Sequence, residues 1–549
     1  MEPSPLTQQA RPEAFQPKIV KLYQALFKEE EDVEKGEGFW REFFLLRPDK
    51  SSLERVLADL SGDDLLHFQS HTRLLFSRSI ENINNARPPS DEIALDTLTA
   101  FLGGILSKKY TNPSSDIISV LTGLDQVDAV FTDFVLSLDV NIRSGRSLDL
   151  RKKAVEAALS ITAGAYQTSL LSFFTHRDLF PSLVKYIQDA DVSSRAFEPF
   201  LLLGLLANYN KFEFQNPYRL RLEDFVNEGT IQKIIRGIGI SCARVRDGYV
   251  AVQDDLPEGW TFNSTLAYFG LGVFTMKAKN SSPAPSPEAL QSLFAALPTP
   301  ESSILLGAYD FANANKLFCF NLVSLAPETK HGESPFSAYL SLTSYLSSHA
   351  HRSSRTSLYA YMNLLVIRLL LEDQVLFYHW SELWRALLTL IRFLTTYASD
   401  LHSLPNVPLL LDSLVNLIAL SLSAGDAFLP GAAEYDDLFY KLVETGDILT
   451  KFRDAYNLSA RPTNSLPTLL SICAHYDELL TSQRTQSRSK NLSPAQVNGV
   501  IKSGYETLSI TAKEGLDGWE RYREADERMT LKKVARVAVA DVRALLAAR

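Results

Sequence analysis

Two histidines, His67 and His71, stand four residues apart, a spacing that can place two imidazoles on one face of a helix. A closed structural zinc site takes about four ligands, and no third ligand is identifiable near this pair. We therefore predict that the pair lies on a solvated helix face and binds no metal. A second pair, His349 and His351, lies in a serine-rich stretch and is predicted to occupy a loop or a helix end.

Residues 237–242, with the sequence GIGISC, begin like a dinucleotide-binding loop. Cys242 stands where the third glycine of such a loop belongs, and no strand followed by a helix is predicted around it. The chain also contains no P-loop, no HExxH motif and no GxSxG motif. The sequence therefore predicts no cofactor and no catalytic residues of these classes, and an enzyme of unrecognised class remains an alternative.

The composition is that of a folded protein with an acidic balance. Apolar residues make up 46% of the 549 residues and charged residues 22%, which excludes disorder of the whole chain. A net charge of −9 argues against a surface that neutralises many nucleic-acid phosphates. The three cysteines are widely spaced and odd in number, which fits neither a disulfide framework nor a zinc site and favours the cytosol.

Apolar residues recur at helical spacing along almost the whole chain, so the predicted class is all-α. Residues 154–162 predict a surface helix with one buried stripe. Three apolar windows, 199–207, 362–371 and 409–422, are too short or too interrupted to cross a membrane and predict buried helices. The clearest helical face comprises Trp380, Leu383, Trp384, Leu387, Ile391 and Leu394.

Breaks in composition divide the chain into predicted regions. Serine or threonine followed by proline predicts helix starts at Pro287, Pro300 and Pro494, and Gln496 completes a capping box for the last of these. No fixed internal period is found, although a degenerate helical solenoid needs only a recurring buried stripe. The predicted regions are a disordered leader (1–17), an N-terminal helical region (18–280), a Pro/Ser-rich linker with a short helix (281–300), a second helical region (301–480), a polar linker (481–493) and a C-terminal helical unit (494–549).

The final predicted helix, about residues 529–547, is amphipathic and basic. Its polar positions carry Lys532, Lys533, Arg536 and Arg543, which are candidates for contact with an anionic membrane surface. The alternative is a capping helix whose apolar stripe packs on the preceding unit, and we favour it because the stripe is rich in alanine and valine and lacks aromatic anchors.

Several segments resemble the armadillo-like helical domain-containing protein 3 family. They occur in one order from about residue 20 to beyond residue 525, so the resemblance covers nearly the whole chain. The segments are 38–46 (GFWREFFLL), 206–218 (LANYNKFEFQNPY), 378–388 (YHWSELWRALL), 425–430 (GDAFLP), 435–440 (YDDLFY), 505–508 (YETL) and 515–522 (GLDGWERY).

The resemblance implies an armadillo/HEAT-like helical solenoid without catalytic residues. It also implies a protein of the cytosol and the peripheral Golgi membrane that supports Golgi maintenance and protein secretion. Expected partners are an Arf guanine-nucleotide exchange factor and phosphatidylinositol 4-kinase beta. The kinase contact is expected from the middle of the chain, which is shorter between Phe320 and Tyr339 than in animal family members, so the exchange factor is the firmer expectation.

The segment 206–218 is a polar, aromatic corner directly after a very apolar helix. Loops often carry function, so Asn208, Tyr209, Lys211, Asn216 and Tyr218 are candidates for a partner surface. The competing and favoured interpretation is that the asparagines cap helix ends while the tyrosines pack the corner.

Further candidates for partner contact are Trp380, Trp384 and Tyr435, which lie in other segments of the resemblance. A cargo-binding solenoid of another transport pathway, such as nuclear transport, remains a second alternative. The weak periodicity argues against it, because such proteins build a concave surface from regular repeats.

Overall fold

A computed structural model of the chain describes residues 16–27, 35–252, 292, 294–328, 332–372, 381–401, 407–428, 432–458, 465–487, 492–507 and 522–548. Within these ranges the regular elements are α-helices and short 3-10 helices, with no strand. The predicted all-α class is confirmed. Contacts divide the chain into two compact units, unit 1 (residues 1–221 and 539–549) and unit 2 (residues 222–538).

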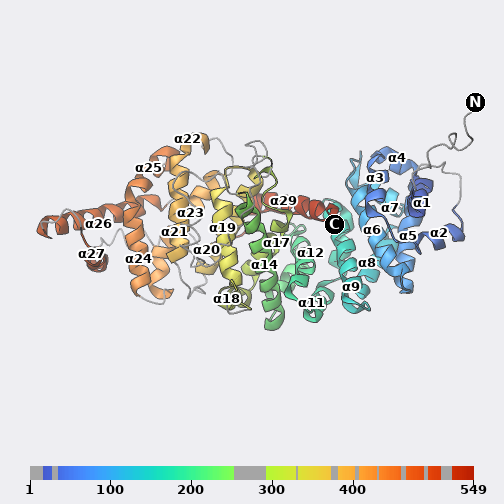
Figure 1. The fold of residues 1–549 in the computed structure, drawn as a ribbon, viewed down its shortest axis with the longest axis horizontal. Helices are drawn as coiled ribbons and strands as arrows, with labels where there is room; N and C mark the ends of the chain where they lie inside the picture. The colour runs from blue at the N-terminus through green and yellow to red at the C-terminus, as the bar shows by residue number, and fades with distance from the viewer. Residues whose placement is uncertain are drawn as a thin grey trace, which may run out of the picture. The chain divides into compact units, whose positions relative to one another are not determined.

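Unit 1 is built from helical hairpins that stack in two rows (Figure 1). The hairpins α5–α6, α8–α9 and α11–α12 follow one another, with α6, α9 and α12 in one row and α5, α8 and α11 in the other. The helices are α1 Lys18–Phe27, α2 Glu37–Phe43, α3 Lys50–Ala58, α4 Gly62–His67, α5 Gln69–Asn85, α6 Ser90–Leu106, α7 Pro113–Leu121, α8 Val127–Ser144, α9 Leu148–Gly164, α10 Ser172–His176, α11 Phe180–Asp189, α12 Phe197–Asn208 and α13 Pro217–Glu223.

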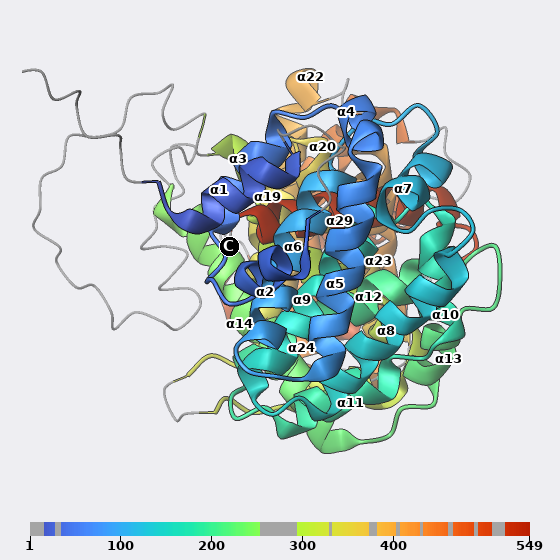
Figure 2. The same ribbon diagram turned by 90° about the vertical axis from the view of Figure 1, so that its right-hand side faces the viewer.

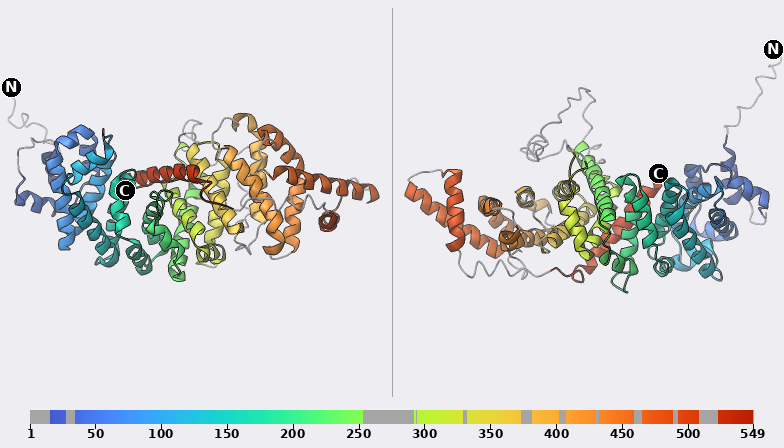
Figure 3. Two further views of the ribbon diagram at one scale, coloured as in Figure 1. Left: turned by 180° about the vertical axis from the view of Figure 1, so that it is seen from behind. Right: turned by 90° about the horizontal axis from the view of Figure 1, so that it is seen from below.

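Unit 2 repeats this arrangement of helices in two rows. One row contains α17, α20, α23 and α26, and the other contains α14, α19, α21 and α25 (Figure 3). The helices are α14 Glu228–Ala251, α17 Ile304–Ala314, α18 Lys316–Ser324, α19 Pro335–Ser348, α20 Ser354–Glu372, α21 Ser381–Thr396, α22 Ala398–Leu401, α23 Val407–Phe428, α24 Ala432–Glu444, α25 Gly446–Tyr456, α26 Leu466–Ser487, α27 Pro494–Thr507 and α29 Arg528–Ala547. The last of these helices continues into unit 1.

Helices in the α6 row are covered on several sides. All twelve residues of α12 are buried, and α9 buries Arg151, Ala157, Ser160 and Ile161 in addition to its predicted apolar stripe. The prediction that α9 is a surface helix with a single buried stripe is therefore wrong. It is wrong because α9 has neighbours in its own row, α6 and α12, as well as its hairpin partner α8.

Polar side chains tie neighbouring helices of unit 1 together. The buried Asp139 of α8 accepts two hydrogen bonds from Arg177, at 3.0 and 2.7 Å. Arg151 of α9 donates to the Ile142 carbonyl at 2.7 Å and to Asp189 at 2.8 Å. Because each buried charge meets an opposite charge or a carbonyl, the stacked helices keep one register.

Two predicted helix starts, at Pro494 and Pro300, differ in whether a side chain caps the helix. At Ser493, the backbone N–H donates to the Gln496 side chain at 2.8 Å, and Gln496 N–H donates to the Ser493 hydroxyl at 3.3 Å. The predicted capping box at Pro494 is thus confirmed. At Pro300 a 3-10 turn, Pro300–Ser303, precedes α17, and the Thr299 hydroxyl caps no amide there.

Of the other predicted boundaries, one differs from the structure and two fall mostly outside the described residues. Helix α26 continues to Ser487, so the first half of the predicted linker 481–493 is helical. Most of the predicted leader 1–17 and of the predicted linker 281–300 lies outside the described residues.

The GIGISC segment lies inside α14, where no nucleotide loop exists. A Cβ at Gly239 would lie 2.7 Å from the Cα and 2.9 Å from the Cβ of Pro335, the first residue of α19. The glycine is therefore required by the close packing of these two helices.

We predict that Gly239→Ala lowers the melting temperature of the chain. Overpacking against backbone costs about 1–3 kcal/mol and outweighs the gain of about 1 kcal/mol in helix propensity. The matched control is Gly499→Ala in α27, where a Cβ meets nothing within 4 Å. Thermal unfolding followed by circular dichroism should show a decrease for the first variant and none for the second, and a Gly239→Ala protein as stable as wild type would contradict the packing argument.

Candidate interaction surfaces

The corner between α12 and α13 is held by one asparagine. Asn216 donates from Nδ2 to the carbonyls of Leu206, at 2.8 Å, and Tyr209, at 3.0 Å, and its Oδ1 accepts from the Tyr218 amide at 2.9 Å. The chain can turn here because Asn210 adopts a left-handed conformation with φ of 48°. The side chain therefore supplies the hydrogen bonds that the backbone loses where α12 ends.

Two tyrosines anchor the corner to the rest of unit 1. The Tyr218 hydroxyl donates to the Phe174 carbonyl at 2.6 Å and accepts from the Leu179 amide at 3.2 Å. Complete burial raises the pKa of Tyr218 well above its ordinary value, so the hydroxyl keeps its proton. The Tyr209 hydroxyl donates to the Thr168 carbonyl at 3.1 Å.

All five candidates of the corner lie in the interior. Asn208, Tyr209, Lys211, Asn216 and Tyr218 each expose 8% or less of their surface. They are brought together as predicted by the packing interpretation, and they do not form an exposed partner surface. The physical reason is that a turn after a fully buried helix is itself covered, so its polar groups must be satisfied within the protein.

The same corner exposes two large apolar side chains that the sequence prediction missed. Phe214 is 41% exposed and Leu220 is 40% exposed. The Phe214 ring lies edge-on to the Tyr209 ring, with centroids 6.3 Å apart. The available signal was that Phe214 stands between the polar residues Glu213 and Gln215.

We predict that Asn216→Asp destabilises unit 1 by about 3 kcal/mol or more, because it places a carboxylate against two buried carbonyls and removes both donors. The control is Gln215→Glu, which makes the same change of charge at an exposed neighbour. Urea unfolding gives the midpoint of unfolding for each variant. Equal midpoints for the two would show that the hydrogen bonds of Asn216 do not hold the corner.

The other predicted contact residues are only partly described. Trp380 lies outside the described residues, and nothing is described of the Trp384 and Tyr435 side chains. On the same predicted face, Leu387, Ile391 and Leu394 of α21 are buried. These three side chains pack within unit 2, as their apolar character predicts.

The C-terminal helix α29 buries its apolar stripe, which comprises Leu531, Val534, Ala538, Val542 and Leu545. The buried stripe agrees with the capping interpretation, but the last turns of α29 pack in unit 1 beside α9 and not on the preceding part of the chain as that interpretation expects. Lys533 and Arg536 are exposed, and Lys532 is half-buried. Arg543 is not free to meet a membrane, because it donates from Nε to the Ala163 carbonyl and from Nη2 to the Gly164 carbonyl, both at 2.9 Å.

The two predicted histidine pairs are placed differently from one another. The prediction that His67 and His71 share one solvated helix face is wrong, because His67 ends α4 whereas His71 belongs to α5. His71 is buried, with Nδ1 2.9 Å from the Leu26 carbonyl. Within the described residues no group of three His, Cys, Asp or Glu side chains is arranged to hold a metal ion. His349 caps the C-terminus of α19, as the prediction of a helix end requires.

His349 lies in a buried aromatic stack of unit 2. Its ring is nearly parallel to Tyr249, with centroids 4.9 Å apart, and lies 5.3 Å from Phe294. Arg352 donates from Nε to His349 Nδ1 at 3.1 Å. Burial, and then the positive charges of Arg352 and His351, lower the pKa of His349 to about 3.

This shift predicts that the fold loses stability in mild acid. Below its ordinary pKa of about 6.5, His349 binds a proton in the unfolded chain but not in the folded one, so stability falls as pH decreases. Between about pH 7.5 and about pH 5.5 the loss from this group is about 1.4 kcal/mol. Urea unfolding at both pH values should show that loss reduced by this amount in His349→Phe, which keeps the stack without titrating. An unchanged difference would contradict a neutral, buried His349.

None of the helices described here combines the length and the apolar character that crossing a bilayer requires.

The sequence of the chain is similar to those of proteins that are named for an armadillo-like helical domain. Residues 342–544 match the family model for the C-terminal part of armadillo-like helical domain-containing protein 3. The UPF0588 membrane protein of Schizosaccharomyces pombe is 23% identical over 95% of this chain and 96% of its own length. Armadillo-like helical domain-containing protein 3 is 22% identical in Homo sapiens and 23% in Xenopus laevis, each over 96% of this chain and 94% of the relative. The human alignment spans 656 positions, more than the 549 residues here, so that relative contains residues this chain lacks.

Proposed function

Because the chain belongs to the armadillo-like helical domain-containing protein 3 family, we propose that it is a non-enzymatic scaffold of the early secretory pathway. It would work in the cytosol and at the Golgi membrane and support Golgi maintenance and protein secretion by binding other proteins. The observation that carries this proposal is similarity along about 95% of the chain rather than in one segment.

The architecture of each unit supports a binding role. Stacked helical hairpins present extended surfaces on which partners dock, and stability depends only on contacts between neighbouring hairpins. Exposed residues on such surfaces can therefore change without loss of the fold. The polar side chains buried at the corner between α12 and α13 are explained by packing, so a catalytic role is not needed to account for them.

Two partners are proposed. The first is an Arf guanine-nucleotide exchange factor, and the second is phosphatidylinositol 4-kinase beta. The kinase is proposed second, because the human relative contains residues that this chain lacks. The family resemblance implies that the shortened part lies between Phe320 and Tyr339, the region expected to contact the kinase.

Peripheral contact with a membrane is part of the same proposal. The relative from Schizosaccharomyces pombe is described by name as a membrane protein. In this chain α29 exposes Lys533 and Arg536, and basic side chains near an anionic leaflet are attracted to it.

The proposed location predicts that the chain, tagged at its own gene, overlaps with Golgi markers and that its removal slows secretion of a reporter and alters Golgi shape. Fluorescence microscopy and a secretion assay in the same cells measure these effects. A nuclear location, or normal secretion and Golgi shape after removal, would contradict the proposal.

The proposed membrane contact predicts that Lys533→Glu/Arg536→Glu weakens partition onto vesicles containing phosphatidylserine by about thirty-fold or more, because each basic residue contributes about 1 kcal/mol. Vesicle flotation of the full chain measures the partition. The control Lys451→Glu/Arg484→Glu makes the same change of charge at exposed positions of α25 and α26. If both variants partition equally onto the vesicles, α29 is not the part of the chain that contacts the membrane.

A further inference from the structure

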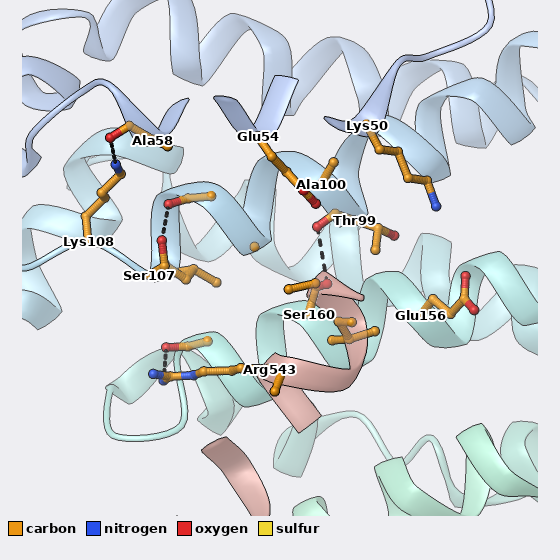
Figure 4. A pocket seen from close by; sticks show the side chains of 17 residues that line it. Lys50, Glu54, Ala58, Thr99, Ala100, Ser107, Lys108, Glu156, Ser160 and Arg543 are labelled. Atoms are coloured by element: carbon orange, nitrogen blue, oxygen red, sulfur yellow. Dashed lines mark hydrogen bonds between the residues drawn. The ribbon is translucent and has the colours of Figure 1, made fainter. Parts of the chain in front are cut away.

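Unit 1 contains a pocket of about 510 Å³ along one side of α6 (Figure 4). Residues of α3 and α9 line it together with α6, and the last turns of α29 complete it. Figure 2 labels α3, α6, α9 and α29 in a second view. Every lining residue belongs to unit 1. A volume of this size is typical of a site that holds part of a partner or a small ligand.

Small residues form the floor of the pocket on α6, where Ala100, Gly103, Gly104 and Ser107 follow at helical spacing. A Cβ at Gly104 would lie 2.5 Å from the Leu57 side chain, so this glycine is needed for packing. A Cβ at Gly103 would meet nothing within 4 Å. Gly103 therefore leaves backbone accessible at the floor without any requirement from the fold.

Each cation of the lining already has a partner. Lys50 lies 3.3 Å from Asp96, and Lys108 donates to the Ala58 carbonyl at the end of α3 at 3.0 Å. Arg543 donates to the last carbonyls of α9. The positive charges are thus paired with a carboxylate and with the carbonyls at the C-terminal ends of two helices, where cations are stabilised.

The lining also contains two carboxylates, Glu54 and Glu156. Lys152 lies 3.7 Å from Glu156. For Glu54, no hydrogen bond or ion pair occurs within the part of the chain that the structure describes. Burial raises the pKa of Glu54 above its ordinary value, although nearby Lys50 partly offsets the effect. A cation placed in the pocket would therefore meet a carboxylate that has no hydrogen bond or ion pair among the described residues, although the charge of Lys50 lies nearby.

One helix already docks beside this space. The end of α29 buries Val542 and Leu545, and it turns Ala544 and Ala547 toward the pocket while Arg543 caps α9. The pocket thus continues a contact in which a helix with small side chains and a basic residue lies against unit 1. Small residues on both sides allow helices to approach closely.

We propose that this pocket is a docking groove for an amphipathic helix of a partner protein, which carries small residues on its apolar face and a lysine or arginine directed at Glu54. Docking of an apolar helix face into a groove is a common form of peptide recognition, and the opposite charge sets its register. The inference rests on the proposed scaffold role but not on the Golgi location.

Selection from a displayed library of short amphipathic helices on the purified full chain tests the proposal. Helices with a basic residue among small ones should be enriched. Gly103→Phe, which fills the open floor, should weaken their binding by at least about ten-fold, whereas Gly499→Phe, at an equally open position of α27, should not. Glu54→Gln should reduce the preference for lysine over glutamate by at least about ten-fold, because a hydrogen bond between charged groups is lost.

Three results of the selection would overturn the proposal. They are the enrichment of no helix, the enrichment of helices that Gly103→Phe does not affect, and a preference for acidic helices. A small molecule of constant mass that native mass spectrometry finds on wild type but not on Gly103→Phe would also assign the pocket to another ligand. Because the selection uses purified protein, its failure would leave the Golgi assignment, which microscopy tests, unaffected.

Discussion

The structure depends on the burial of the apolar side chains of its helices, which a single helix cannot achieve alone. The buried sides of α9 are covered by α6, α8 and α12, and the same relation recurs among the rows of unit 2. Stacking of hairpins is the arrangement in which each hairpin covers the apolar side chains of the next one. It also leaves the outer faces of the helices available, which is why a binding role suits the fold.

The same constraint places polar side chains inside the protein wherever the chain turns between buried helices. Asn216 bonds two carbonyls at the end of α12. Asn315 acts alike before α18, where its Nδ2 donates to the carbonyls of Leu222, at 2.8 Å, and Phe225, at 2.7 Å. Since unpaired backbone groups are costly when buried, such asparagines are as necessary to the stack as its leucines.

Periodicity and capping were enough to predict the helical class, the start of α27 and the buried stripe of α29, because these depend on local spacing. The break between His67 and His71 was not predictable, since a helix can end without glycine or proline where tertiary packing requires it. The sequence left two alternatives for the Asn208–Tyr218 corner, burial and an exposed partner surface. It could not decide between them, because burial depends on contacts with Phe174 and Leu179, which lie far away in the chain. The pocket beside Gly103 was missed for the same reason, as α3, α6, α9 and α29 meet only in the fold.

The most direct test of the central claim, that this chain binds proteins of the secretory pathway, is affinity purification of the tagged chain at its natural level from gently lysed cells, followed by mass spectrometry. The account predicts recovery of an Arf guanine-nucleotide exchange factor, with phosphatidylinositol 4-kinase beta absent or weak. Enrichment of only metabolic enzymes or nuclear import factors would contradict it and would leave the family relationship as a statement about fold alone.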